Sequence, residues 1–143
     1  MKRTASARWQ GGLKDGKGAL TTQSTVLADT PYSFSTRFEE GKGTNPEELI
    51  AAAHAGCFTM ALSAQLEKAG LKADSLETNA TVTMEKRETG WEVTESHLDV
   101  TARIPGADPE RFEAAANEAK AGCPISRLLN TMITMEARLA TTA

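Results

Sequence analysis

Hydrophobic residues recur at every second position in four stretches of the chain, a pattern that predicts β-strands. These stretches cover residues 4–10, 75–87, 91–104 and 133–139. Within residues 91–104, Trp91 and Val93 occupy odd positions, whereas Leu98 and Val100 occupy even ones. One extra residue near positions 94–97 would explain this change of phase, so we expect a β-bulge there. Shorter strands are predicted for residues 19–27 and 32–38.

A long helix is predicted to begin near residue 45 and to end at Gly70, which can supply a left-handed C-terminal cap. Thr44 and Glu47 could form a capping box at its start, or Asn45 could cap it with Pro46 at the first helical position. Residues 50–62 are apolar or small on nearly all sides. This composition indicates a helix buried on most faces, which a second helix could approach closely.

A second helix is predicted over residues 109–121, after Asp108, with Phe112 and Ala116 on its inner face. A short helical turn over residues 125–129 is expected after the break at Gly122-Cys123-Pro124. Strands in a run, a long helix, a hairpin, a helix and a strand together indicate an α+β fold. Because no linker or repeat divides residues 1–143, we expect a single domain.

Composition and charge narrow the possible partners. The formal net charge of −3 and the sequence pI near 5.4 argue against a nucleic-acid-binding surface. The first ten residues contain no apolar signal segment, and no apolar run approaches the ~18 residues that span a bilayer. We therefore expect a cytoplasmic protein without a membrane partner. The glycines of residues 11–18 match no phosphate-binding spacing and are expected to form a hairpin turn.

The two cysteines are the main candidates for chemistry. A static disulfide is unusual in a reducing compartment, so the pair is inert, metal-binding or redox-active. Cys57 lies in the apolar middle of the long helix, where buried inert cysteines are common. Cys123 lies at a helix junction, where we expect a partly exposed thiol near helical N–H groups that favour the thiolate. An attacking Cys57 and a resolving Cys123 are compatible with this pattern.

Two other uses of these residues stay open at this point. His54 and Cys57 share a helix face, and His97 and Cys123 could complete a Cys2His2 metal site, although the spacing matches no compact zinc motif. His54 and Cys57 could also act together on an acyl substrate, but no third orienting group accompanies them. Considered singly, Arg37 and Glu47 are an ordinary surface arginine and a helix-capping glutamate.

Three segments together resemble the OsmC/Ohr family of osmotically inducible and organic hydroperoxide resistance proteins. They are Thr-Arg-Phe-Glu at residues 36–39, Gly-Thr-Asn-Pro-Glu-Glu-Leu-Ile-Ala-Ala-Ala-His-Ala-Gly-Cys-Phe at residues 43–58, and Ala-Lys-Ala-Gly-Cys-Pro-Ile-Ser at residues 119–126. The likeness covers essentially the whole chain. The opening Arg-Trp-Gln-Gly at residues 8–11 is similar to the OsmC branch.

The resemblance implies an OsmC-like fold, with antiparallel strands wrapped around a long central helix, and an intertwined homodimer with active sites at the subunit interface. It implies a thiol-dependent peroxidase that prefers organic hydroperoxides to hydrogen peroxide. By motif, Cys57 matches the peroxidatic cysteine, Cys123 the resolving cysteine, Arg37 the catalytic arginine and Glu47 the glutamate that holds it. No bound cofactor or metal is implied. The reductant would be an external dithiol, for which the family suggests lipoylated proteins.

These assignments are chemically consistent. A guanidinium beside Cys57 would lower its pKa and stabilise charge on the departing oxygen. The resulting sulfenic acid would condense with Cys123 to a disulfide. Phe58 and Met60 are expected to contribute to an apolar lining. The helical rise over ten residues is about 15 Å, so we expect Arg37 and Glu47 to serve Cys57 of the other subunit.

A rival hypothesis requires no catalysis. An apolar cleft in a homodimer could sequester a small lipid-like ligand while both thiols stay inert. It predicts that substitution of Cys57 leaves function intact.

Overall fold

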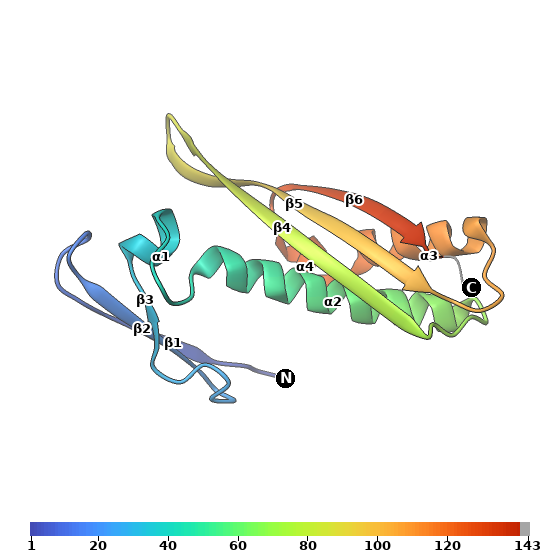
Figure 1. The fold of residues 1–143 in the computed structure, drawn as a ribbon, viewed down its shortest axis with the longest axis horizontal. Coiled ribbons are helices and arrows are strands. Elements are labelled where there is room, and N and C mark those ends of the chain that lie inside the picture. The colour runs from blue at the N-terminus through green and yellow to red at the C-terminus, as the bar shows by residue number, and fades with distance from the viewer. Residues whose placement is uncertain (141–143) are drawn as a thin grey trace. The chain divides into compact units, whose positions relative to one another are not determined.

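The computed structural model describes residues 1–140, and their contacts cluster in two units, residues 1–49 and residues 50 onward. Both strands and helices are present, which confirms the predicted α+β class (Figure 1). The elements in chain order are β1 (Ala5–Gln10), β2 (Lys17–Thr22), β3 (Thr30–Tyr32), α1 (Phe34–Phe38), α2 (Pro46–Lys68), β4 (Ser75–Arg87), β5 (Gly90–Arg103), α3 (Pro109–Gly122), α4 (Pro124–Leu128) and β6 (Met132–Leu139).

The first unit contains a three-stranded antiparallel sheet in the order β1-β2-β3. The rings of Trp9 and Tyr32 lie 5.5 Å apart between centroids. A Cβ at Gly18 would come within 2.4 Å of the Tyr32 ring and 2.6 Å of the Trp9 ring. Position 18 therefore needs glycine, because the two aromatic side chains occupy the space above its backbone.

The strand predicted for residues 32–38 is wrong, because most of that segment forms the short helix α1. Ser33 caps this helix through a capping box in which its side chain accepts from Thr36 N–H and the Thr36 side chain accepts from Ser33 N–H. This local pairing satisfies free helical N–H groups and outweighs the strand propensity of the aromatic residues.

The first unit has almost no core of its own. Within residues 1–49, all of which the structure describes, the buried positions are Gly16, Thr36 and Thr44, and no hydrophobic side chain is buried. Every residue of β1 is exposed. A three-stranded sheet without a covered apolar face gains little hydrophobic stabilisation, so this unit needs further burial to be stable.

Both ends of α2 follow from local sequence signals. At the start, Asn45 Oδ1 accepts a hydrogen bond of 2.8 Å from Glu48 N–H, so the Asn45–Pro46 start is the one that forms. At the end, Gly70 has φ of +76°, Leu71 N–H bonds to the Leu66 carbonyl and Gly70 N–H to the Glu67 carbonyl. This is a Schellman motif, as the glycine after the helix predicts.

Two glycine-to-alanine substitutions at helix ends are expected to change stability in opposite directions. Gly70→Ala should lower the free energy of unfolding by about 1–2 kcal/mol, because alanine is strained at positive φ. Gly122→Ala should raise it by up to about 1 kcal/mol, because position 122 is the last residue of a helix and a Cβ there meets no heavy atom within 4 Å. Urea unfolding of both variants measures this. Equal effects of the same sign would contradict the assigned cap.

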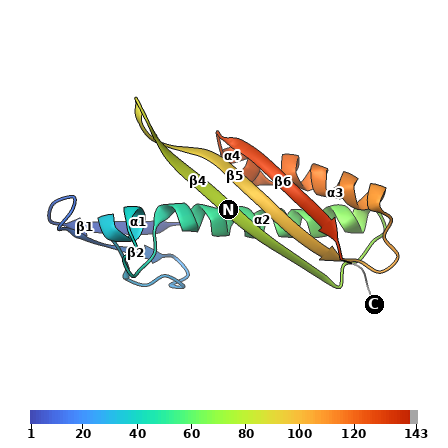
Figure 2. The ribbon, with the colours of Figure 1, turned by 45° about the horizontal axis from the view of Figure 1, so that its top comes forward.

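The second unit is built on the sheet β4-β5-β6. β4 and β5 form an antiparallel hairpin in which Thr83 pairs with Glu95 but Met84 pairs with Val93. Thr94 is therefore the extra residue, which confirms the predicted bulge. β6 runs parallel to β5, whereas we expected antiparallel neighbours. The reason is that α3 and α4 carry the chain back to the end of the sheet at which β5 begins. The β4–β5 tip extends past the N-terminal end of β6, which begins opposite Glu95 (Figure 2).

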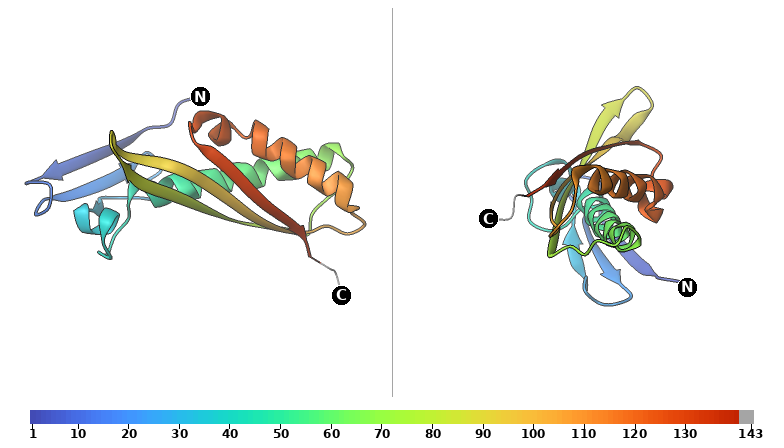
Figure 3. Two further views of the ribbon diagram at one scale, coloured as in Figure 1. Left: turned by 90° about the horizontal axis from the view of Figure 1, so that it is seen from above. Right: turned by 90° about the vertical axis from the view of Figure 1, so that its right-hand side faces the viewer.

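One face of this sheet carries the core. Helices α2 and α3 lie on the same side of the sheet (Figure 3). Fully buried side chains include Phe58 and Leu62 of α2, Leu98 and Val100 of β5, Phe112 and Ala116 of α3, and Cys123. The even-numbered residues of β5 after the bulge thus face the helices, as the hydrophobic pattern predicts.

Helix α2 is also the one helix within residues 1–140 that is long and apolar enough, by length and composition, to cross a membrane. Its mean hydropathy reaches 1.4 over an 18-residue window, of which 22% is buried. We expected no stretch of this kind, but the uncharged polar residues that interrupt it do not lower the mean hydropathy enough. A core helix of a soluble protein passes the same test, so this is weak support for a membrane span.

Candidate functional site

The two cysteines, which are distant in sequence, lie side by side in the second unit. Cys57 lies in the middle of α2, and Cys123 immediately precedes α4. Their Sγ atoms are 2.8 Å apart, within hydrogen-bond distance, and both are free thiols. The structure therefore brings together the two residues that the sequence singled out as attacker and resolver.

The burial of the two thiols is the reverse of what we expected. Cys123, which was predicted to be partly exposed, is fully buried, whereas Cys57 is only partly buried. The reason is that Cys123 points into the core at the junction of α3 and α4. Phe58, expected in a substrate lining, is also fully buried in the core, while the Met60 side chain is 79% exposed.

The surroundings of Cys57 raise its pKa above the ordinary value of 9.0. Burial is the main cause and the neighbouring Cys123 thiol adds to it, while a hydrogen bond from the backbone N–H of Ile125 acts in the opposite direction. A thiol with a raised pKa is protonated at neutral pH and is a poor nucleophile. The residues around Cys57 in this unit therefore do not favour its thiolate. A positive charge next to the sulfur would be required to lower the pKa.

Arg37 and Glu47 form an ion pair in the first unit. Arg37 Nε donates to Glu47 Oε1 at 2.7 Å, and the Glu47 side chain is 14% exposed. The other carboxylate oxygen of Glu47, Oε2, is buried and has no hydrogen-bond partner among the described residues. Because the pair uses Nε alone, the two terminal nitrogens of the guanidinium remain for another anion. The pair thus presents a positioned positive charge.

An aromatic pocket of about 190 Å³ lies next to this guanidinium. Trp9, Tyr32, Phe34 and Phe38 line it together with Arg37, whose guanidinium carbon is 5.4 Å from the centroid of the Phe38 ring. An aromatic wall with one charged group suits a ligand that has an apolar body and a polar end. The sequence did not reveal this pocket, because the aromatic residues that line it lie in three separate elements, β1, β3 and α1.

His54 takes part in a network that the sequence did not predict. It is completely buried, with Nδ1 2.6 Å from Ser96 Oγ and Nε2 2.7 Å from Ser126 Oγ. Burial lowers its pKa below 6.5, so the ring is neutral at neutral pH. A histidine among alanines in an apolar helix was the available signal, but its serine partners come from distant segments.

The metal hypothesis finds no matching arrangement. Both ring nitrogens of His54 are engaged by serine hydroxyls, and His97 Nδ1 lies 2.6 Å from Thr134 Oγ1. Among residues 1–140, no group of three or more histidine, cysteine, aspartate or glutamate side chains is placed to hold a metal ion. The acyl-transfer hypothesis also lacks support, because no bond joins His54 to a thiol and its nitrogens are occupied.

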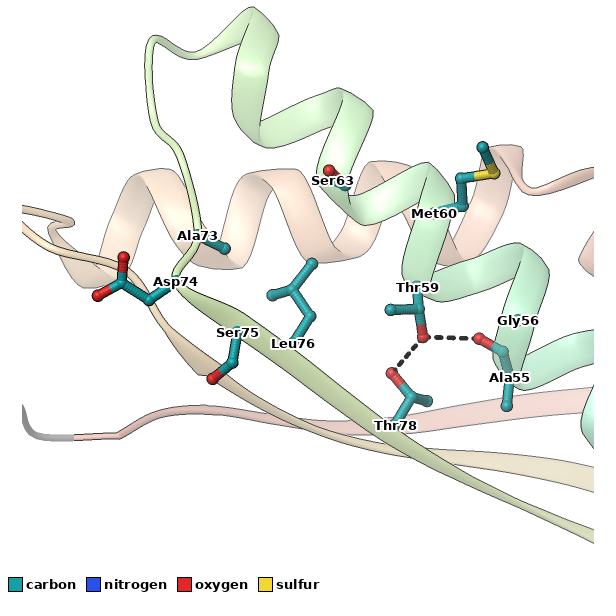
Figure 4. A pocket seen from close by; sticks show the side chains of 10 residues that line it. All are labelled: Ala55, Gly56, Thr59, Met60, Ser63, Ala73, Asp74, Ser75, Leu76 and Thr78. Carbon is teal, nitrogen blue, oxygen red and sulfur yellow. Dashed lines mark hydrogen bonds between the residues drawn. The ribbon is translucent and has the colours of Figure 1, made fainter.

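A pocket of about 640 Å³ in the second unit is a shallow groove between α2 and β4 (Figure 4). Its lining includes Gly56, Met60, Ser63 and Leu76 but neither cysteine. The hydroxyls of Thr59 and Thr78 point toward one another at 2.7 Å and link the helix to the strand. This groove exposes small side chains rather than reactive ones.

Comparisons with known proteins show which family the chain is similar to. The family model described as OsmC-like protein matches residues 39–138. Peroxiredoxin OsmC of Escherichia coli is 46% identical over 97% of each chain. The crystal structure of the organic hydroperoxide resistance protein OhrB of Bacillus subtilis superposes with a TM-score of 0.66 at 25% identity, covering 96% of this chain and 98% of that one. An OsmC-like protein of unknown function from Vibrio cholerae has a TM-score of 0.75 at 16% identity, covering 96% and 99%.

Proposed function

Because the chain belongs to the OsmC-like protein family, we propose that it is a thiol-dependent peroxidase that reduces organic hydroperoxides to alcohols. The observation that carries the proposal is the 2.8 Å separation of the Cys57 and Cys123 sulfurs. Two free thiols at this distance can be oxidised together to a disulfide with little rearrangement. The relatives named as a peroxiredoxin and as organic hydroperoxide resistance proteins support the choice of substrate class.

The proposed reaction has two steps. The thiolate of Cys57 attacks one peroxide oxygen, the O–O bond breaks, and the departing alkoxide takes a proton and leaves as the alcohol. Cys57 is then a sulfenic acid, which Cys123 attacks to form the disulfide with loss of water. An external dithiol then reduces the Cys57–Cys123 disulfide to two thiols and is itself oxidised to a disulfide, which replaces the two electrons that the peroxide took. No bound cofactor or metal is needed, and a reducing cytoplasm would supply the dithiol, for which we propose a lipoylated protein.

Arg37 is proposed to supply the positive charge that Cys57 lacks within its own unit. A guanidinium next to the sulfur would lower the pKa that burial raises, and it would stabilise the departing oxygen. Glu47 would hold the guanidinium through the 2.7 Å ion pair. The aromatic pocket next to Arg37 would receive the organic part of the peroxide, which accounts for a preference over hydrogen peroxide.

We propose that the active protein is an intertwined homodimer. Two observations support this state: residues 1–49 bury no hydrophobic side chain, and one side of α2 exposes Ala53, Gly56, Met60 and Ser63. These positions are three or four residues apart and form one face, on which a second α2 could pack closely. Arg37 and Glu47 of one chain would then serve Cys57 of the other.

Stopped-flow oxidation by cumene hydroperoxide and by hydrogen peroxide, with mass spectrometry of the product, tests the function. Burial of a phenyl group contributes roughly 1.5–3 kcal/mol, so we expect cumene hydroperoxide to react about 10–100 times faster. The product should be the Cys57–Cys123 disulfide. If cumene hydroperoxide binds but both thiols stay reduced, the protein is instead a non-catalytic dimer that sequesters small apolar ligands.

A further inference from the structure

We propose that the buried hydrogen-bond network of His54, Ser96 and Ser126, here called the histidine bridge, positions Cys123 for attack on oxidised Cys57. The bridge joins three elements, since His54 lies on α2, Ser96 on β5 and Ser126 on α4. Its bonds of 2.6 and 2.7 Å are short, and the histidine is fully buried. This inference rests on the proposed peroxidase function, in which Cys123 resolves Cys57.

The histidine bridge lies next to the contact between the two sulfurs. Cys57 follows His54 by one helical turn, and Ser126 follows Cys123 by the same number of residues. His54 and Cys57 lie on the same face of α2, because they are three residues apart on a helix. Cys123 is the N-cap of α4, and Ser126 lies in the first turn of that helix. The imidazole–serine bond and the sulfur–sulfur contact therefore join the same two segments of the chain, three residues apart on each.

Helix α4 depends on such contacts for its position. It has five residues, and Cys123 at its N-cap makes no side-chain capping hydrogen bond. A helix this short is not stable on its own. Once Cys57 becomes a sulfenic acid, an oxygen is inserted at its sulfur and the original contact between the two thiols is changed. The bond from His54 to Ser126 contains no sulfur, so it can hold α4 in place during this step.

The bridge acts by position and exchanges no proton with the sulfurs. Cys123 must attack the Cys57 sulfur, so that the S–S bond forms, the S–O bond breaks and water leaves. A second peroxide molecule competes for the same sulfenic acid and converts it to sulfinic acid. Because correct placement raises the effective concentration of the attacking group, loss of the bridge should favour the second outcome.

The test measures how the oxidised protein partitions between disulfide and sulfinic acid at increasing concentrations of cumene hydroperoxide. In Ser126→Ala, the concentration that over-oxidises half of the chains should fall about tenfold, the effect of ~1.4 kcal/mol from one lost buried hydrogen bond. The rate of the first oxidation of Cys57 should change less than about twofold. Ser126→Thr keeps a hydroxyl and should behave as the wild type.

Two further variants complete the design. Thr59→Val removes the hydroxyl that bonds to Thr78, close to Cys57 but away from α4, and should leave the partition unchanged. His54→Asn has a side chain too short to reach Ser126, so it should reproduce Ser126→Ala and replaces it if that variant does not fold. An unchanged partition in the bridge variants, or an equal loss in Ser126→Thr, would overturn the proposal.

Oxidation by diamide separates this inference from the function on which it rests. Diamide takes two electrons and two protons from a pair of thiols and forms the disulfide without peroxide. If the wild type forms the Cys57–Cys123 disulfide with diamide and Ser126→Ala does so about tenfold more slowly, the positioning role holds even if peroxide leaves the thiols unoxidised. If peroxide oxidises the wild type and Ser126→Ala to the same products in the same proportions, the positioning role is wrong while the peroxidase function stands.

Discussion

Replacing Cys57 with serine is expected to lower the rate of cumene hydroperoxide reduction by at least about a thousandfold. The hydroxyl of serine has a far higher pKa than a thiol and cannot form a sulfenic acid, so both steps of the proposed reaction are lost. Steady-state consumption of peroxide in the presence of dihydrolipoamide measures this effect.

Cys123→Ser is the matched control for this prediction. It removes the same kind of group from the other side of the 2.8 Å contact. Without added dithiol, the variant should consume about two equivalents of peroxide per chain and then stop, because one equivalent takes Cys57 to the sulfenic acid and a second takes it to the sulfinic acid. If Cys57→Ser keeps wild-type turnover, the peroxidase assignment is wrong and the ligand-sequestering dimer becomes the better account.

Replacing Arg37 with alanine is expected to slow the oxidation of Cys57 by about 10²–10³. The residues around Cys57 in its own unit raise its pKa, so without the guanidinium the thiol stays protonated at neutral pH. The rate should follow the thiolate fraction, which increases about tenfold per pH unit below the pKa. The rate of the wild type should level off at a lower pH, because Arg37 lowers the pKa of its Cys57. The rate of the variant should keep rising to a higher pH.

Two comparisons make the arginine prediction specific. Arg87→Ala removes an exposed arginine paired with Glu92 at 3.1 Å and should leave the rate unchanged. Glu47→Gln keeps the shape of the partner of Arg37 but removes its charge, so an intermediate loss is expected. The same pH profile for Arg37→Ala and wild type would show that Arg37 does not act on the thiol.

Mixed dimers test whether the arginine comes from the other chain. A Cys57→Ser chain paired with an Arg37→Ala chain should recover one functional site, because one chain supplies the thiol and the other the guanidinium. Complete inactivity of the mixed dimer, with both parent chains folded, would place Arg37 and Cys57 of the same chain in one site.

Much of the fold could be predicted because its signals are local. The bulge at Thr94 appears in the sequence as a change of hydrophobic phase, and the ends of α2 appear as Asn45 and Gly70. The segment of residues 32–38 misled us because its aromatic residues favour strands, while the capping box of Ser33 and Thr36 favours a helix. Local signals of similar strength compete there, and the pattern of apolar residues alone does not decide between them.

The candidate site was predictable only in part. Motif resemblance identified Cys57 and Cys123, and the structure adds that the second is the more deeply buried. The serines that bind His54 could not be predicted, because no spacing relates positions 54, 96 and 126 until the sheet and helices pack together. The parallel placement of β6 has the same origin, since it depends on where α3 and α4 return the chain.

The parallel pairing of β5 with β6 has a consequence for how the protein folds. The β4–β5 hairpin joins neighbours in sequence and can form early, whereas Leu98 meets Met135 only after both intervening helices are in place. Long-range pairings of this kind close slowly, because loop entropy is lost before any contact is gained. Cys123 belongs to that late segment. A newly synthesised chain therefore contains Cys57 without its partner for some time, and oxidant damage during synthesis would fall on that one sulfur.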